Sequence, residues 1–311
     1  MSSALRIVTR ESPLAMWQAC HVRDSLKRIH SGLNVEVIGI KSEADKFLDA
    51  SLARLGGKGA FVKELEQALL EQRADLAVHS MKDVTVDLPD TLRLSTILAR
   101  EDPSDAFVSN SYSGLEEMPD GASIGTSSLR RQCQIRARRP GLRVVDIRGN
   151  VGTRLRKLDD GGYDALVLAS AGLIRLGLGD RITSQLGTDV MLPAIGQGAL
   201  GIEVRSMDHD TQRLVSPLND GDTYQCVTAE RMVNRRLNGG CHAPIAAYAR
   251  MDNHNLTVSA LVGNLDGTEI IRADIEGPSR DAERLGDRLG RILLDKGAGR
   301  ILEQLRFDGR L

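Results

Sequence analysis

Aromatic side chains are scarce in this sequence, where they make up 3% of 311 residues and include a single Trp. The cores must therefore be built mainly from Leu, Ile, Val and Ala. The sequence also lacks any apolar run of about 18 residues, the length that a membrane-spanning helix needs. No basic-then-apolar leader is present at Met1–Arg10. We therefore expect no membrane span and no cleaved secretory signal, and hence a cytoplasmic protein.

Cysteine is also rare. The four cysteines show no CxxC spacing and no regular framework, which favours free thiols in a reducing compartment: Cys20, Cys133, Cys226 and Cys241. Cys241 follows two glycines and precedes Pro244 by three positions, so we expect an exposed turn with an accessible thiol. The adjacent His242 does not make a protease dyad, and no second ligand at a suitable spacing favours zinc or another metal. On this pattern alone Cys241 is a loop thiol.

Charge is balanced over the whole chain, with 41 basic and 42 acidic side chains, but it is unevenly distributed along the sequence. Residues 122–181 hold twelve Arg or Lys and five Asp or Glu. A solvated basic face is one interpretation. However, nearly all these cations are Arg, which suits bidentate binding of carboxylate or phosphate, and several lie near predicted helix starts that favour anions. The segment therefore predicts a site for a small, multiply negative molecule.

The first half of the sequence alternates strands and helices, which favours a parallel or mixed sheet covered on both faces. Ser12 and Pro13 provide an N-cap and a first-turn proline for a helix through about Ile29. A second helix, Phe61–Gln72, is expected to place Leu65, Leu69 and Leu70 on one side. The strands are predicted at Leu5–Thr9, Asn34–Ile40, Leu76–His79 and Leu92–Leu98.

A boundary is expected near Arg100–Pro103, after which the same alternation restarts. Here Ser127 is predicted to cap a helix through about Arg138. The other elements are predicted as strands at Ser123–Gly125, Arg143–Ile147 and Ala165–Leu168, and helices at Val151–Leu158 and from about Ala171. From about Asp222 the pattern changes to a helix ending at Leu237, three strands and a last helix, which is typical of a small α+β domain. The three strands are predicted at Ile245–Ala249, Leu256–Val262 and Glu269–Ile275, and the last helix at Arg280–Leu294.

Two glycine-rich motifs are similar to nucleotide sites but lack their context. Gly196–Gly201 matches GxGxxG, yet it follows Pro193 and opens no strand–turn–helix unit, so a backbone crossing between domains is favoured over a dinucleotide site. Gly56–Gly59 lacks the spacing of an ATP-binding loop, although Lys58 within it could meet an anion.

The run His79–Asp83 follows a predicted strand end, where catalytic side chains gather in such sheets. His79 and Ser80 are adjacent on the strand and should point to opposite faces, which argues against a Ser–His nucleophile pair. Asp83 has two interpretations. It could cap the next turn, or it could stabilise a cation or donate a proton in a cleft rich in Arg.

Together these motifs resemble porphobilinogen deaminase, also called hydroxymethylbilane synthase, over almost the whole chain. The segments that carry the resemblance are Arg6–Arg10, Ser12–Ala15, Gly56–Gly59, Phe61–Glu66, Ala77–Asp83, Arg100–Pro103, Gly125–Gln132, Arg148–Val151, Pro193–Gly198 and Gly239–Cys241. The resemblance implies an α/β fold in which two periplasmic-binding-protein-like domains flank an active-site cleft, with a small C-terminal α+β domain. Domain 1 would comprise residues 1–99 with 199–216, the arginine-rich domain 2 residues 100–198, and domain 3, with the cofactor cysteine, residues 217–311.

The resemblance also implies an activity. The protein would be a monomeric transferase of haem biosynthesis that joins four porphobilinogen molecules head to tail into hydroxymethylbilane and releases ammonia. Its dipyrromethane cofactor, made from the same substrate, would be bound covalently through Cys241. Each pyrrole ring carries an acetate and a propionate, which are the groups that arginine binds well.

The family's functional residues are carried over position by position. Asp83 matches its catalytic carboxylate. The cofactor-binding positions match Cys241, Lys82, Asp83, Thr126, Ser127, Ser128, Arg130, Arg131, Arg148 and Gly149. The substrate-binding positions match Arg10, Ser12, Phe61, Arg148, Arg154, Arg175 and Gln197. The mobile active-site loop would include Asp45, Arg54 and Lys58.

This sequence departs from the family at Ser42-Glu43-Ala44, where many members have Thr-Arg-Gly. We expect Glu43 to alter the motion or pace of the loop rather than to abolish the chemistry. The main rival function is a non-catalytic protein that binds an anionic solute, against which the third domain and Cys241 argue. Nucleic-acid binding by the arginine segment is less favoured, because only Tyr163 could stack on bases there.

Overall fold

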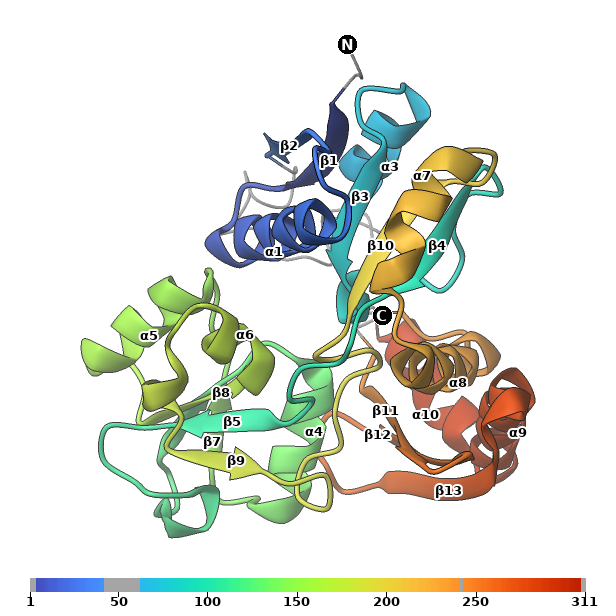
Figure 1. The fold of residues 1–311 in the computed structure, drawn as a ribbon. Helices are drawn as coiled ribbons and strands as arrows, with labels where there is room; N and C mark the ends of the chain where they lie inside the picture. The colour runs from blue at the N-terminus through green and yellow to red at the C-terminus, as the bar shows by residue number, and fades with distance from the viewer. Residues whose placement is uncertain (1–3, 42–61, 241–242, 309–311) are drawn as a thin grey trace. The chain divides into compact units, whose positions relative to one another are not determined.

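A computed structural model describes residues 4–41, 62–240 and 243–308 (Figure 1). The chain divides into two compact units: Met1–Glu101 with Ala199–Tyr224, and Asp102–Gly198 with Gln225–Leu311. The three-domain division expected from the sequence remains a prediction. Within the described ranges, no helix combines the length and hydropathy needed to cross a bilayer.

The first unit is built on a five-stranded mixed sheet in the order β2-β1-β3-β10-β4. Its strands are β1 (Leu5–Arg10), β2 (Val35–Ile40), β3 (Leu76–Ser80), β4 (Leu92–Ile97) and β10 (Leu200–Arg205). β1 is parallel to β2 and β3, whereas β10 is antiparallel to β3 and β4. The helices are α1 (Pro13–Ile29), α3 (Lys63–Leu70) and α7 (His209–Val215). α1 and α3 pack on opposite faces of the sheet in two separate apolar clusters.

Local sequence explains where these helices begin and end. The Ser12 hydroxyl accepts a hydrogen bond from Ala15 N at 3.3 Å, which confirms the predicted cap of α1. α3 is shorter than predicted, and Gln72 beyond its end has a left-handed backbone with φ 56°. The expectation for Leu70 was wrong, because it is 47% exposed while Leu65 and Leu69 are buried. In a helix Leu70 lies about 100° around the axis from Leu69, away from the sheet.

The second unit contains a similar sheet in the order β7-β6-β8-β5-β9. Its strands are β5 (Asp105–Val108), β6 (Ser123–Gly125), β7 (Arg143–Val145), β8 (Ala165–Ala169) and β9 (Ser184–Leu186). β6 is parallel to β7 and β8, and β5 is antiparallel to β8 and β9. α4 (Leu129–Arg138) packs on one face, and α5 (Val151–Asp159) and α6 (Ser170–Arg175) pack on the other.

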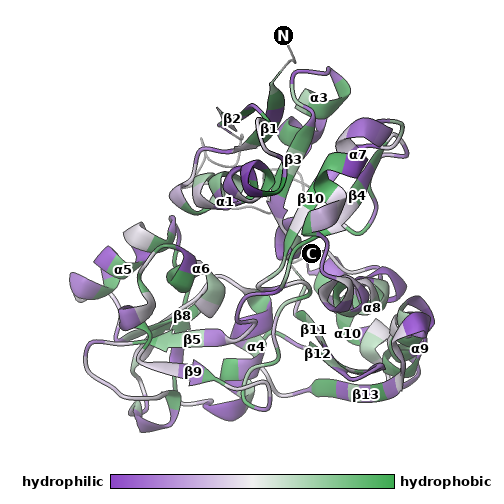
Figure 2. Cartoon of the chain, viewed as in Figure 1, coloured by the Kyte–Doolittle hydropathy of each residue, from purple (hydrophilic) through white to green (hydrophobic). Residues whose placement is uncertain are grey.

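In Figure 2 hydrophobic residues follow β3, β10 and β8, and hydrophilic residues lie on α5 and α7.

The C-terminal part of this unit is an antiparallel sheet in the order β11-β12-β13, packed against helices. Its elements are α8 (Gly221–Leu237), β11 (Ile245–Asp252), β12 (Asn255–Gly263), β13 (Ile270–Pro278), α9 (Ala282–Asp295) and α10 (Ala298–Phe307). The β12–β13 turn docks on α4, where Arg136 Nη1 donates to Leu265 O at 2.5 Å. Gly267 is required there, because its φ is +77° and a Cβ would lie 2.4 Å from Ala137 N.

The two five-stranded sheets share one strand order, with an antiparallel strand in fourth place. In each sheet this strand is the first one after the chain passes between the units: β5 follows Asp102, and β10 follows Ala199. Two such α/β sheets and a small C-terminal α+β part confirm the predicted fold class. The sequence interpretation omitted β5, β9, β10, α7 and α10.

Replacing Gly201 by Ala should destabilise the first unit. The new Cβ would lie 2.2 Å from Met81 Sδ, and Met81 is buried, so its side chain cannot swing into solvent. We expect the free energy of unfolding in urea to fall by about 1–3 kcal/mol. Gly114→Ala is the control, since Gly114 has nothing within 4 Å. Equal stability of the two variants would contradict this account of β10.

Candidate functional site

The first unit gathers predicted site residues at one edge of its sheet. β1 and β3 are parallel neighbours, so their carboxyl ends meet there. β1 ends at Arg10 and is followed by the cap residue Ser12. β3 ends at Ser80 and is followed by the 3-10 turn Met81–Asp83, which Met81 N ties to Ala199 O at 3.0 Å. The structure thus brings Arg10 and Ser12 to the same edge as Lys82 and Asp83.

The two side chains that precede this turn point to opposite faces, as predicted. Ser80 Oγ lies 2.9 Å from Gln18 Nε2 on α1. His79 Nε2 lies 2.9 Å from Glu203 Oε2 in the buried interior. Burial, together with the charge of Glu203, raises the pKa of Glu66 on α3 nearby, although His79 opposes this. This geometry excludes a Ser80–His79 nucleophile pair.

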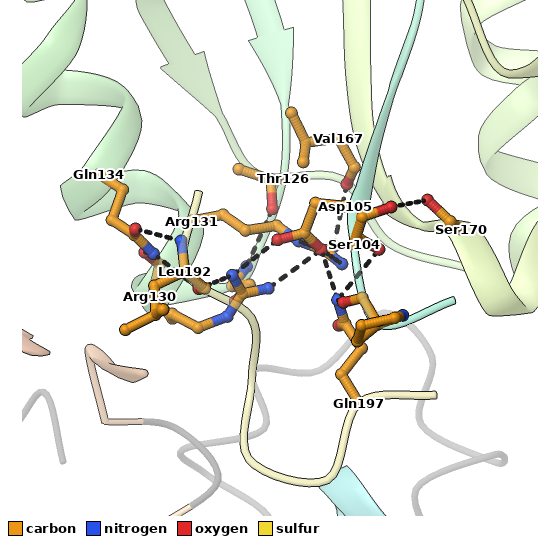
Figure 3. Close-up of polar contacts among 12 residues, drawn as sticks. Ser104, Asp105, Thr126, Arg130, Arg131, Gln134, Val167, Ser170, Leu192 and Gln197 are labelled. Carbon is orange, nitrogen blue, oxygen red and sulfur yellow. Dashed lines mark hydrogen bonds and ion pairs between the residues drawn. The ribbon is translucent and has the colours of Figure 1, made fainter. Parts of the chain in front are cut away.

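In the second unit the adjacent arginines of α4 converge on one carboxylate, that of Asp105 on β5 (Figure 3). Arg130 donates through Nη1 to Oδ2 at 2.7 Å and through Nη2 to Oδ1 at 3.2 Å. Arg131 donates through Nε and Nη2 to Oδ1, at 3.0 and 2.7 Å. Gln197 Nε2 donates to Oδ1 at 2.9 Å, which is the fifth hydrogen bond to this carboxylate. All four side chains are buried.

The charges of this cluster do not cancel. Burial alone would raise the pKa of Asp105, but the charges and hydrogen bonds of Arg130 and Arg131 outweigh it and hold that pKa well below its ordinary value. Burial lowers the pKa of Arg131, against the opposing charge of Asp105. Arginine nevertheless stays protonated in proteins, so two positive charges face one negative charge. The cluster therefore favours a further anion.

Two residues just before α4 tie its start to β7 and to the residues that follow β7. Ser127 Oγ donates to Ile147 O at 2.6 Å and accepts from Ile147 N at 3.1 Å. Our prediction that Ser127 caps this helix was therefore wrong. Ser128 takes the cap position and makes no side-chain cap bond. Thr126, which is buried, follows β6 and donates its backbone N–H to Val145 O at 2.9 Å.

The segment that leads into α5 carries a second set of predicted residues. Asn150 caps α5 by accepting from Thr153 N at 2.9 Å. Gly149 has φ +111°, and a Cβ there would lie 2.7 Å from Thr153 Cγ2, so only glycine fits. Arg154 Nε donates back to Gly149 O at 2.8 Å. Arg148 follows Ile147, so it stands next to the contact with Ser127.

Residues 192–198, here called the connecting segment, include the predicted residue Gln197, which joins the cluster (Figure 3), and contact a second predicted residue, Arg175. Gln197 reaches Asp105, and Arg175 Nη2 donates to Gly198 O at 2.7 Å. Leu192 O accepts from Arg130 Nη1 at 2.8 Å. Gly196 and Gly198 have φ of +68° and +88°, which explains the glycines of the GxGxxG match by backbone conformation.

Some predicted residues lie outside the described part of the chain. They are Cys241, Phe61 and the loop residues Asp45, Arg54 and Lys58, together with the departure at Ser42-Glu43-Ala44. The other three cysteines are described, and Cys20 and Cys133 are free thiols. Burial raises the pKa of Cys133 to about 11, which makes it a poor nucleophile.

Family models match two stretches of the sequence. Residues 5–213 match the porphobilinogen deaminase dipyrromethane cofactor binding domain, and residues 224–295 match the porphobilinogen deaminase C-terminal domain. The chain belongs to the porphobilinogen deaminase family. This confirms the predicted resemblance, the activity in tetrapyrrole synthesis with a pyrrole substrate, and the dipyrromethane cofactor.

Solved structures share the fold only. A nutrient-binding protein from Burkholderia cenocepacia bound to methionine is 13% identical, with 68% of this chain and 90% of that chain covered and a TM-score of 0.43. A periplasmic substrate-binding protein of an ABC transporter from Coxiella burnetii is 14% identical, with 73% and 96% covered and a TM-score of 0.44. Neither likeness supports a solute-binding role for a porphobilinogen deaminase.

The arginine cluster fits a cofactor that carries carboxylates. Arg130 Nε is buried and has no hydrogen-bond partner within the described residues. Such a donor is costly unless an acceptor meets it, and a carboxylate meets it best. The excess positive charge around Asp105 favours the same ligand.

Sequence reasoning missed Asp105, which organises the cluster. A usable signal existed, because two adjacent arginines in one helix need a counter-charge and Asp105 stands directly before the apolar run Ala106–Val108. Glu230, a fully buried carboxylate on α8, was missed as well. Helical periodicity does not distinguish it from a surface residue.

Replacing Asp105 by Asn should remove the counter-charge of two buried guanidiniums. We expect the free energy of unfolding at neutral pH to fall by about 3–5 kcal/mol. In the wild-type protein the folded pKa of Asp105 is depressed, so its contribution is complete above the unfolded value of about 3.9 and is lost as the pH falls below it. Urea unfolding from neutral pH to about pH 3 should therefore show a shallower acid decline for Asp105→Asn than for the wild type.

The control is Asp159→Asn. It breaks a partly exposed pair with Arg181 and should cost less than about 1 kcal/mol. A loss in Asp105→Asn no larger than in this control would contradict the central role of Asp105.

Proposed function

We propose that this chain is a hydroxymethylbilane synthase, a transferase that joins four porphobilinogen molecules head to tail and releases ammonia. The observation that carries the proposal is the pair of buried guanidiniums that share the single carboxylate of Asp105. An anion-binding cluster of this kind suits a product that gains an acetate and a propionate with every ring. The family match supports the same activity.

In this proposal Cys241 bears the dipyrromethane, and Arg130 and Arg131 bind its carboxylates. The bound dipyrromethane supplies the free pyrrole end to which new rings are added. Arg148, held next to Ile147, and Arg154, held against Gly149 O, bind carboxylates of the substrate and the growing chain. The hydroxyls of Thr126 and Ser128 provide further hydrogen-bond donors near the start of α4, and Ser127, whose hydroxyl donates to Ile147 O, holds that segment in place.

Asp83 is the proposed catalytic residue. Loss of ammonia from porphobilinogen leaves a cation delocalised over the pyrrole ring. The Asp83 carboxylate, placed near the pyrrole N–H, would stabilise this charge and accept and pass on the proton that the ring releases. Its position in a short turn fixed by Met81 N supports this role, since a preorganised charge stabilises a transition state best.

The proposal includes a cytoplasmic monomer without nucleic-acid or membrane partners. The free thiols of Cys20 and Cys133 suit a reducing compartment. The near-neutral overall charge gives no reason to expect a polyanionic partner.

Intact mass tests the attachment site. The purified chain should exceed its sequence mass by two linked pyrrole units, and Cys241→Ser should lose both that excess and the activity. Cys20→Ser is the control and should keep both. An unmodified chain that is fully active would overturn the proposal.

Asp83→Asn tests the catalytic role. Turnover should fall by about 10²–10⁴-fold, because the amide cannot accept the proton or stabilise the cation as a carboxylate does. The mass excess and the thermal unfolding temperature should not change. Asp90→Asn, an exposed position in the same connection, should behave as the wild type. A comparable loss in Asp90→Asn, or none in Asp83→Asn, would rule out the assignment.

A further inference from the structure

Glu230 on α8 is fully buried, and both of its carboxylate oxygens accept backbone hydrogen bonds. Oε2 accepts from Gly196 N at 2.6 Å, and Oε1 accepts from Ala249 N at 2.8 Å. A carboxylate is the side chain that satisfies two N–H donors at once. These charge-assisted bonds join α8 to the connecting segment on one side and to β11 on the other.

The connecting segment links Glu230 to the arginine cluster. Next to Gly196, Gln197 donates to Asp105, which holds Arg130 and Arg131 (Figure 3). The other end of the segment is also held, because Leu192 N donates to Gln134 Oε1 on α4 at 2.8 Å. Gly196, which Glu230 binds, and Gln197, which contacts Asp105, are adjacent in the chain.

The two elements that Glu230 joins also flank Cys241 in the sequence. α8 ends at Leu237 and β11 begins at Ile245. The described residues on either side of Cys241 and His242 are bonded to each other, since Ala243 N donates to Gly240 O at 3.1 Å. The Ile245 side chain also packs against Gly239, where an added Cβ would lie 2.3 Å from Ile245 Cδ1. The position of α8 and β11 therefore fixes the two ends of the short segment that contains Cys241.

We propose that Glu230 is a positioning residue that aligns the cofactor-bearing segment between α8 and β11 with the guanidiniums of Arg130 and Arg131. This inference rests on the proposed function, in which Cys241 bears the dipyrromethane. Glu230 touches neither substrate nor cofactor in this account. It acts through Gly196, Gln197 and Asp105.

The test replaces Glu230 by Gln, which keeps the size but can accept only one of the two hydrogen bonds. Turnover per loaded molecule, counted by intact mass, should fall about tenfold with KM nearly unchanged, because a small misplacement of reacting groups slows catalysis steeply. The amide proton of Gly196 should exchange with solvent faster than in the wild type. Glu230→Ala should show both effects more strongly, and if it does not fold, Glu230→Gln alone decides.

Val233→Ala is the matched control. Val233 is one turn further along α8 and fully buried in the C-terminal core, so its truncation weakens the same helix without removing either hydrogen bond. It should lower the unfolding temperature but leave turnover per loaded molecule and Gly196 exchange unchanged. An equal loss of turnover in this control, or wild-type turnover in Glu230→Gln, would overturn the inference. If the intact mass of the wild-type chain showed no excess of two pyrrole units, the proposed function itself would be wrong.

Discussion

The buried carboxylate of Asp105 is the interaction on which the arginine-rich part of the structure depends. It accepts five hydrogen bonds from two arginines of α4 and from Gln197 of the connecting segment. Neither the carboxylate nor the guanidiniums could be buried alone without a large desolvation cost. Because two cations share one anion, the cluster is held rigidly and still attracts further carboxylates.

The fold places this cluster by the way the chain passes between its two units. Each passage delivers an antiparallel strand to the fourth place of a sheet, and Asp105 is the first residue of one of them, β5. The other, β10, pairs with β3 immediately before the turn that carries Asp83. In each unit the inserted strand thus fixes a charged residue, Asp105 or Asp83, at the edge of the sheet where the parallel strands end. Rigid elements of this kind hold functional groups more accurately than loops do.

The sequence predicted the local features well and the non-local ones poorly. The cap at Ser12 and strand β6 depend on neighbouring residues, and both were found as expected. β5 and β10 were omitted because they form only when distant strands pair with them. Ser127 was assigned to a cap although its hydroxyl bonds Ile147, twenty positions away, which no local pattern reveals. Family resemblance supplied Arg130 and Arg131, but the counter-ion that organises them became visible only in the structure.

In the proposed function the arginine pair of α4, arranged by Asp105, binds the carboxylates of the cofactor. The most direct measurement is the ¹H–¹⁵N NMR signal of Arg130 Nε–H in the loaded wild-type protein and in the cofactor-free Cys241→Ser variant. A downfield shift and slower hydrogen exchange are expected in the loaded protein, because a carboxylate then accepts the hydrogen bond from this N–H. The same signal and the same exchange rate in both proteins would contradict it.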